Sequence, residues 1–171
     1  MIKIFFITSI FYMFLVANSF SAGSSSSGGD SSSGGDGGSI KSNYEKAVSY
    51  IKSAKKYEKK GKTEKANKKY EKALSLLIKS NKRKPNTPDT LNYLGFTTRK
   101  LGDYKNGEKY YLEGLAIEPN HIGINEYLGE LYVVTNRIAL AKDRLKVLEN
   151  CNCEEYDDLK EIIAGTKKSK Y

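Results

Sequence analysis

Hydrophobic and polar positions alternate with helical spacing in the part of the chain that follows residue 40. Residues 154–165 show the pattern most simply, because Tyr156, Leu159, Ile162 and Ile163 share one helical face and acidic residues occupy the other. The pattern predicts seven helices, at about residues 42–60, 63–83, 88–101, 104–117, 121–135, 138–149 and 154–165. We therefore expect an all-α fold with no sheet.

The predicted helices carry an internal repeat. Residues 61–77 align with residues 102–118 at an offset of about 41, and residues 94–114 align with residues 128–148 at an offset of about 34. The two offsets differ by about seven residues, which corresponds to two helical turns. An insertion of this length makes one helix longer without rotating its buried face. The repeat therefore stays in phase along the chain.

The repeated positions have distinct physical roles. Gly61, Gly102 and Asn136 tolerate a positive φ, so each can end one helix and turn the chain into the next. Small side chains let antiparallel helices approach closely, and bulky ones fill the space between them. The small positions are Ala66, Ala73, Gly95, Gly107, Gly114, Gly129 and Ala141, and the bulky ones are Tyr57, Tyr70, Leu94, Tyr111, Leu128, Leu145 and Leu148. This arrangement predicts an α-solenoid of about three helix hairpins, closed by residues 154–165 as a C-terminal capping helix.

The segment at residues 91–120 resembles a tetratricopeptide repeat (TPR). The residues that match the family pattern are Leu94–Gly95, Gly102–Asp103, Gly107, Tyr111 and Pro119. The resemblance implies repeats at residues 47–84, 88–121 and 122–153 within a helical domain at residues 40–165. The first copy departs from the pattern at Ser53–Ala54, and the third has Cys153 where proline is usual.

In this family the first helices of successive repeats line a concave groove, so the resemblance implies partner contacts there. Carried over by position, the groove residues are Ile51, Lys55, Lys59, Asn92, Phe96, Arg99, Glu126, Glu130 and Val133. The chaperone-binding members of the family hold the terminal carboxylate of a peptide with Lys, Asn and Arg residues. Most matching positions here hold other residues, including Ile51, Tyr93, Gly123 and Tyr127, so that particular ligand is not expected.

An apolar run precedes the predicted helical domain. It covers residues 4–17, follows Lys3, and is followed by small residues that permit cleavage after Ser19 or Ser21. As a helix the run would cover roughly 21 Å, which is shorter than the ~30 Å hydrocarbon core of a bilayer. We expect residues 1–21 to be a cleaved signal peptide, with an uncleaved membrane anchor as the alternative. Cleavage predicts export to the periplasm or the extracellular space and leaves no stable membrane span.

Two segments outside the predicted helices have little to bury. Residues 22–39 consist almost entirely of Ser, Gly and Asp, so we expect a disordered linker. Residues 166–171 are expected to be a flexible basic tail.

Residues suited to catalysis are scarce. His121 is the only histidine and lies where a helix is predicted to begin, which favours a role at the helix start over that of a general base. The acidic pairs Glu154–Glu155 and Asp157–Asp158 lie in the first turn of the last predicted helix, where they stabilise the helix dipole. Because no nucleophile motif or metal-ligand cluster is recognisable, we expect a non-enzymatic protein without a metal or a cofactor.

Cys151 and Cys153 are the only cysteines and are separated by one residue. In an oxidising compartment they are expected to form a disulfide that staples the loop before the last helix. Redox exchange, metal binding and free thiols stay open as alternatives.

The net charge of +9 is concentrated in the first predicted repeat. Residues 41–84 hold 16 Lys or Arg and 4 acidic residues, whereas residues 85–171 hold 12 and 14. An excess of this kind attracts an acidic protein or an anionic membrane surface, although it is also compatible with a solvated lysine-rich face. Nucleic acid is not expected as the partner, because the chain is predicted to be exported and has no recognised nucleic-acid-binding module.

These features together predict an exported scaffold or adaptor that binds a protein or peptide of unknown identity. One alternative is an envelope-associated structural protein whose lysine-rich first repeat binds an anionic surface, and salt-sensitive binding to anionic vesicles would favour it. Another is thiol–disulfide activity of Cys151 and Cys153, which loss of activity on replacing both cysteines would favour.

Overall fold

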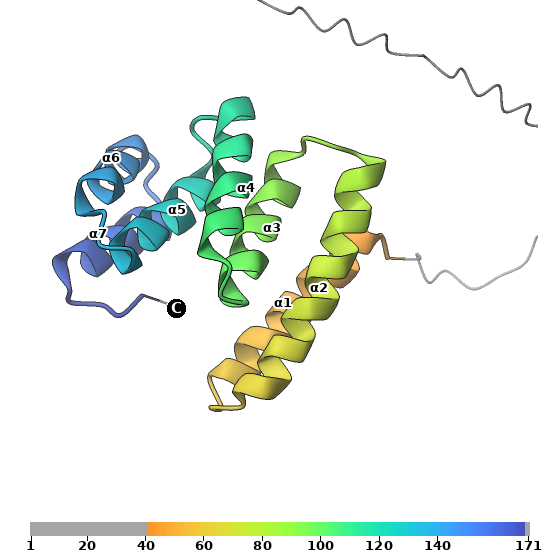
Figure 1. The fold of residues 1–171 in the computed structure, drawn as a ribbon. Helices are drawn as coiled ribbons and strands as arrows, with labels where there is room; N and C mark the ends of the chain where they lie inside the picture. Colours follow the sequence, from red (N-terminus) through yellow and green to blue (C-terminus); the bar gives the residue numbers. More distant parts are fainter. Residues whose placement is uncertain (1–40, 170–171) are drawn as a thin grey trace, which may run out of the picture. The chain divides into compact units, whose positions relative to one another are not determined.

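A computed structural model describes residues 41–169, and the predicted signal peptide (1–21) and linker (22–39) lie outside these residues. The described part of the chain forms helices and no strand. The helices are α1 (Asn43–Glu58), α2 (Thr63–Arg83), α3 (Pro88–Lys100), α4 (Tyr104–Ile117), α5 (Ile122–Val134), α6 (Ile138–Leu148) and α7 (Glu154–Ala164) (Figure 1). The all-α prediction is confirmed, and every helix begins and ends within two residues of its predicted bounds.

Consecutive helices pair as hairpins that stack in the order of the sequence (Figure 1). α1 pairs with α2, α3 with α4, and α5 with α6, while α7 packs against α5 and α6 at the far end of the stack. The first helices of the hairpins also contact one another, α1 with α3 and α3 with α5. The predicted α-solenoid of about three hairpins with a C-terminal capping helix is confirmed.

The turns inside the three hairpins share one hydrogen-bonded structure. The turn residues Gly61, Gly102 and Asn136 have φ angles of 66°, 92° and 58°. Each donates its N–H to the carbonyl three positions back, at 2.8, 2.9 and 3.0 Å, and the following residue donates to the carbonyl five positions back, at 2.9, 3.2 and 2.7 Å. This pair of bonds is the Schellman motif, which satisfies carbonyls at the end of a helix and requires a left-handed residue. The repeat found in the sequence therefore corresponds to the regular recurrence of the same helix C-terminal turn.

The core is continuous along the stack. Tyr70 and Tyr111, which occupy equivalent positions of two repeats, are fully buried between their hairpins. Buried residues of α1, α2 and α3 form one cluster and those of α4, α5 and α6 form a second, and Tyr127 packs against both. Leu159 and Ile162 of α7 are buried at the C-terminal end. Each hairpin therefore buries its apolar surface against a neighbour, as expected of a repeat protein.

The chain beyond α7 turns back towards α5. Gly165 ends α7 with a φ of 74°, and the segment after it runs back alongside the last helices (Figure 1). The Nζ atom of Lys167 pairs with Asp158 and lies 3.6 Å from Oε2 of Glu161. The hydroxyl of Ser169 donates to Oε2 of Glu130 at 3.3 Å. Residues 166–169, the described part of the predicted flexible tail, therefore contact α7 and α5.

Candidate functional site

Side chains from all three hairpins meet on the first helices. The rings of Phe96 in α3 and Tyr127 in α5 lie with their centroids 5.1 Å apart. The Nζ atom of Lys55 in α1 lies 4.5 Å from the centroid of the Phe96 ring and 5.7 Å from that of the Tyr127 ring. A cation over aromatic faces at these distances is attracted by the ring quadrupoles. We call Lys55, Phe96 and Tyr127 the aromatic cluster.

A pocket opens beside the aromatic cluster. Its volume is about 420 Å³, and the described residues that line it are Lys55, Glu58, Lys59 and Phe96. Glu58 is held in place, because it accepts a hydrogen bond from the Tyr70 hydroxyl at 2.8 Å and pairs with Lys100. Lys59 is exposed to solvent. The pocket therefore combines positive and negative charge above a buried aromatic ring.

A buried ion pair fixes α5 against α3 next to the aromatic cluster. Nη2 of Arg99 lies 3.1 Å from Oε2 of Glu130, and neither side chain is exposed. Nη1 of Arg99 donates to the backbone carbonyl of Tyr127. The guanidinium therefore bridges a side chain and a main-chain group of α5, and it sets the position of Tyr127 relative to Phe96.

Tyr111 of α4 is buried close to the same charged groups. Burial raises the pKa of its hydroxyl well above the ordinary value, and the neighbouring Arg99 guanidinium lowers it by a smaller amount. The nearby carboxylates of Glu130 and Glu126 act in the same direction as burial. The Tyr111 hydroxyl therefore stays protonated at neutral pH.

The predicted groove residues fall into two environments. Lys55, Lys59 and Val133 are exposed or partly exposed, whereas Ile51, Asn92, Phe96, Arg99, Glu126 and Glu130 are at most 7% exposed. The structure brings Lys55, Lys59 and Phe96 together at the pocket and pairs Arg99 with Glu130. It places Ile51 in the buried cluster formed by α1, α2 and α3.

Sequence reasoning missed two residues of the site. Glu58 lies three positions after Lys55 in α1, so helical spacing alone could have placed it on the same face. Tyr127 was recognised only as a departure from the carboxylate-binding pattern. Its contact with Phe96 depends on how α5 packs against α3, for which the sequence holds no local signal.

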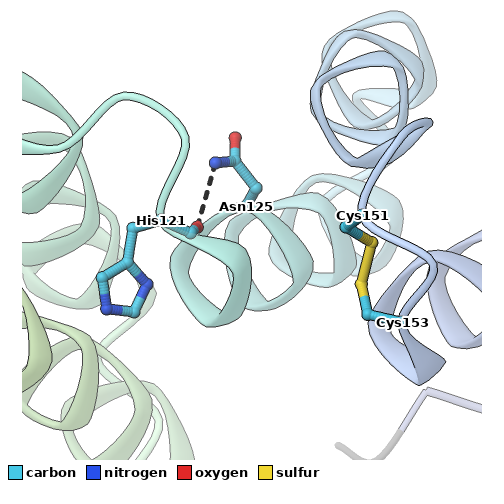
Figure 2. The surroundings of a disulfide bond; sticks show 4 residues. All are labelled: His121, Asn125, Cys151 and Cys153. Atoms are coloured by element: carbon cyan, nitrogen blue, oxygen red, sulfur yellow. Dashed lines mark hydrogen bonds between the residues drawn. A yellow bond between two sulfur atoms is a disulfide. The ribbon is translucent and has the colours of Figure 1, made fainter.

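His121 starts α5 and is not part of the groove. Its Nδ1 accepts the N–H of Ile124 at 3.2 Å, and its Nε2 lies 3.2 Å from Oδ1 of Asp89. The buried amide of Asn125 donates to the backbone carbonyl of His121 at 3.0 Å (Figure 2). One ring nitrogen thus caps α5 and the other contacts Asp89 of α3, and the predicted role at a helix start is confirmed.

Cys151 and Cys153 are joined by a disulfide in the loop between α6 and α7. Figure 2 shows the ring of His121 directed away from the sulfur atoms. Histidine and cysteine therefore do not form a joint site. Among residues 41–169, no three His, Cys, Asp or Glu side chains lie close enough together to hold a metal ion. No helix within the same residues combines the length and apolar character needed to cross a bilayer.

The lysine-rich part of the sequence forms the surface of the first hairpin. Of the 16 Lys and Arg residues between positions 41 and 84, 14 are exposed. Lys59, at the pocket, is one of them. A ligand that approaches the pocket therefore does so through a positive field.

Comparisons with known proteins identify the class of fold. No family model matches the sequence. The chain is 39% identical over 72 residues to the Sol locus transcriptional repressor of Clostridium acetobutylicum, a match that spans 40% of this chain and 23% of that protein. Among solved structures, the first TPR of Spaghetti (RPAP3), bound to the HSP90 peptide SRMEEVD, is 19% identical with a TM-score of 0.52, over 75% of this chain and 98% of that chain. This protein is therefore a TPR-like, all-α helical-repeat protein.

Proposed function

We propose that the protein is a non-enzymatic scaffold that binds a peptide or a segment of another protein along α1, α3 and α5. The aromatic cluster and its adjoining pocket of about 420 Å³ carry the proposal, because they combine an aromatic ring with accessible charge on the first helices of the stack. Two further points support it. The solved TPR neighbour holds a peptide, and repeat folds of this kind usually serve as binding surfaces.

The lining of the pocket indicates the chemistry of the ligand. Lys55 and Lys59 offer positive charge at the pocket, whereas the Phe96 ring under Lys55 is only 1% exposed and offers little surface to a ligand. Because Lys59 is exposed, its ammonium meets an approaching carboxylate early. We therefore expect peptides that carry an acidic residue.

Reversing the charge of Lys59 tests whether peptides bind at the pocket that this residue lines. Peptides selected from a random display library on the full chain should lose affinity about tenfold, or about 1.4 kcal/mol, in the variant Lys59→Glu, because an attractive charge becomes a repulsive one. Titration calorimetry gives the dissociation constants. Lys68→Glu is the matched control, since Lys68 is an exposed residue of α2. Equal losses in both variants, or no loss in either, would place the binding site elsewhere.

We also propose that the protein is exported. The apolar run at residues 4–17 and the small residues after it support this, and a disulfide between Cys151 and Cys153 agrees with an oxidising compartment. Amino-terminal sequencing of the protein recovered from its own cells should start at Phe20 or Ala22. Recovery of the protein with Met1 intact would contradict export by a cleaved signal.

A further inference from the structure

The stack of hairpins is covered differently at its two ends (Figure 1). At the C-terminal end, α7 packs against α5 and α6. Within the stack, α3 packs against α2 of the preceding hairpin and α5 packs against α4. No hairpin precedes α1 among the described residues. The side of α1 that corresponds to these contacts is therefore left without a neighbouring helix from residues 41–169.

Repeat-equivalent positions show what this side of α1 lacks. Ser53 in α1 is equivalent to Leu94 in α3 and to Leu128 in α5. Both leucines are at most 1% exposed, in buried clusters that they share with residues of α2 and of α4, respectively. Ser53 is only partly buried, and Lys56 is exposed although its equivalent Thr97 is fully buried. The position that the second helix of a preceding hairpin fills beside α3 and α5 is thus open beside α1.

A pocket of about 510 Å³ lies on this side of the first hairpin. Tyr50 and Leu76 line it with partly exposed apolar surface, and Ser53 lies beside them. Its charged lining consists of Lys41, Lys46 and Lys69. It shares none of its described lining residues with the pocket next to the aromatic cluster. The two pockets are therefore separate candidate sites.

The charge around the Tyr50 pocket has one sign. The Nζ atoms of Lys69 and Lys72 lie 5.2 Å and 6.0 Å from the centroid of the Tyr50 ring. None of the four acidic residues between positions 41 and 84 lines the pocket. A lysine-rich face that served only solubility would not require a hollow with apolar surface among the lysines. The combination fits a ligand that brings both negative charge and apolar side chains.

We propose that the Tyr50 pocket binds an acidic amphipathic helix of another protein, which takes the place of a preceding hairpin beside α1. A helix fits because α2 and α4 fill the equivalent position beside α3 and α5. A second copy of this chain fits less well, since its acidic helix α7 already buries its apolar residues Leu159 and Ile162. The inference goes beyond the proposed function, because it concerns a second surface with its own ligand.

Fluorescence anisotropy with two labelled peptides of about 18 residues tests the proposal on the full chain. One peptide carries leucines at helical spacing among glutamates, and the other has the same composition with that spacing broken. Only the first should bind, and Lys46→Glu should weaken it about tenfold because a rim charge is reversed. Lys62→Glu, in the turn between α1 and α2, is the matched control and should change the affinity less than about twofold. Equal binding of the two peptides, or equal losses in the two variants, overturns the proposal.

The variant Ser53→Leu provides a test that poor folding cannot imitate, because a gain is expected. Leucine at the equivalent positions 94 and 128 is buried in the clusters shared with the preceding hairpin. The same side chain at position 53 should therefore tighten binding of the acidic helix about five- to tenfold. Unchanged or weaker binding would contradict a helix at this position.

Three further results would assign the surface to something else. Affinity that falls in Lys59→Glu and not in Lys46→Glu would place the acidic helix in the groove, and the proposed function would stand without this inference. Self-association in analytical ultracentrifugation that Lys46→Glu abolishes would make the occupant a second copy. Sedimentation with phosphatidylglycerol vesicles that depends on Lys46, without binding of the acidic helix, would make it a membrane surface. Each of these results overturns the proposal.

Discussion

The variant Arg99→Ala should lose about 3–5 kcal/mol of its free energy of unfolding, which is a large share of the roughly 5–15 kcal/mol of an ordinary domain. Arg99 and Glu130 are both fully buried, and the guanidinium also donates to the carbonyl of Tyr127. Truncation removes the cation from a fully buried site and leaves the carboxylate of Glu130 without that partner. Urea unfolding followed by circular dichroism at the helical bands measures the loss.

Two controls separate the buried charge from ion pairing in general. The double variant Arg99→Met, Glu130→Met should be markedly more stable than Arg99→Ala, because it removes both charges and keeps the volume. Lys109 and Glu113 form an exposed ion pair on α4, with Nζ and Oε1 3.9 Å apart. Breaking this pair in Lys109→Ala should cost under about 1 kcal/mol. A loss of similar size in Arg99→Ala and Lys109→Ala would contradict the expected cost of the buried pair.

The variant Gly95→Val should lose about 3 kcal/mol or more, although valine forms helices better than glycine does. A Cβ atom at position 95 would lie 2.5–2.9 Å from three atoms of the Tyr111 ring. Tyr111 is fully buried, so its ring has no open space into which it can move. The close approach of α3 and α4 therefore requires glycine at this position, and thermal unfolding should show the cost.

A double-variant cycle tests whether the Tyr111 ring is the cause. Adding Gly95→Val to a Tyr111→Leu background should cost less than adding it to the natural sequence, since the smaller side chain leaves room. Ala116→Val is the matched control for helix propensity, because Ala116 is exposed on α4, and it should change stability by less than about 1 kcal/mol. Strictly additive losses would mean that the strain at position 95 has another source.

The helices were predictable because their signals are local. A helix ends where a residue accepts a positive φ and the next residues can form the Schellman bonds, and Gly61, Gly102 and Asn136 are visible in the sequence. Small residues such as Gly95 mark close contacts in the same way, because the absence of a Cβ atom is itself the signal. The repeat then showed that the hairpins are equivalent, which is enough to predict a stack.

The candidate site was predictable only in part. Position in the repeat identified Lys55, Lys59 and Phe96, which the structure brings to one pocket. The same reasoning assigned Arg99 and Glu130 to the groove lining, where the structure buries them as a pair. The position of a residue in the repeat indicates which face of a helix it occupies. How deeply its side chain is buried on that face depends on how closely α5 approaches α3.

The sequence by itself determined the number of helices, their ends and their order in the stack, because these depend on backbone preferences and on apolar surface that only a neighbouring hairpin can cover. The tertiary structure alone decided which groove positions are accessible, that Tyr127 completes the aromatic cluster, and that Ser169 contacts Glu130. Composition suggested only a flexible basic tail. Its contacts join residues far apart in the chain, and such pairs exist only once the helices that carry them are packed.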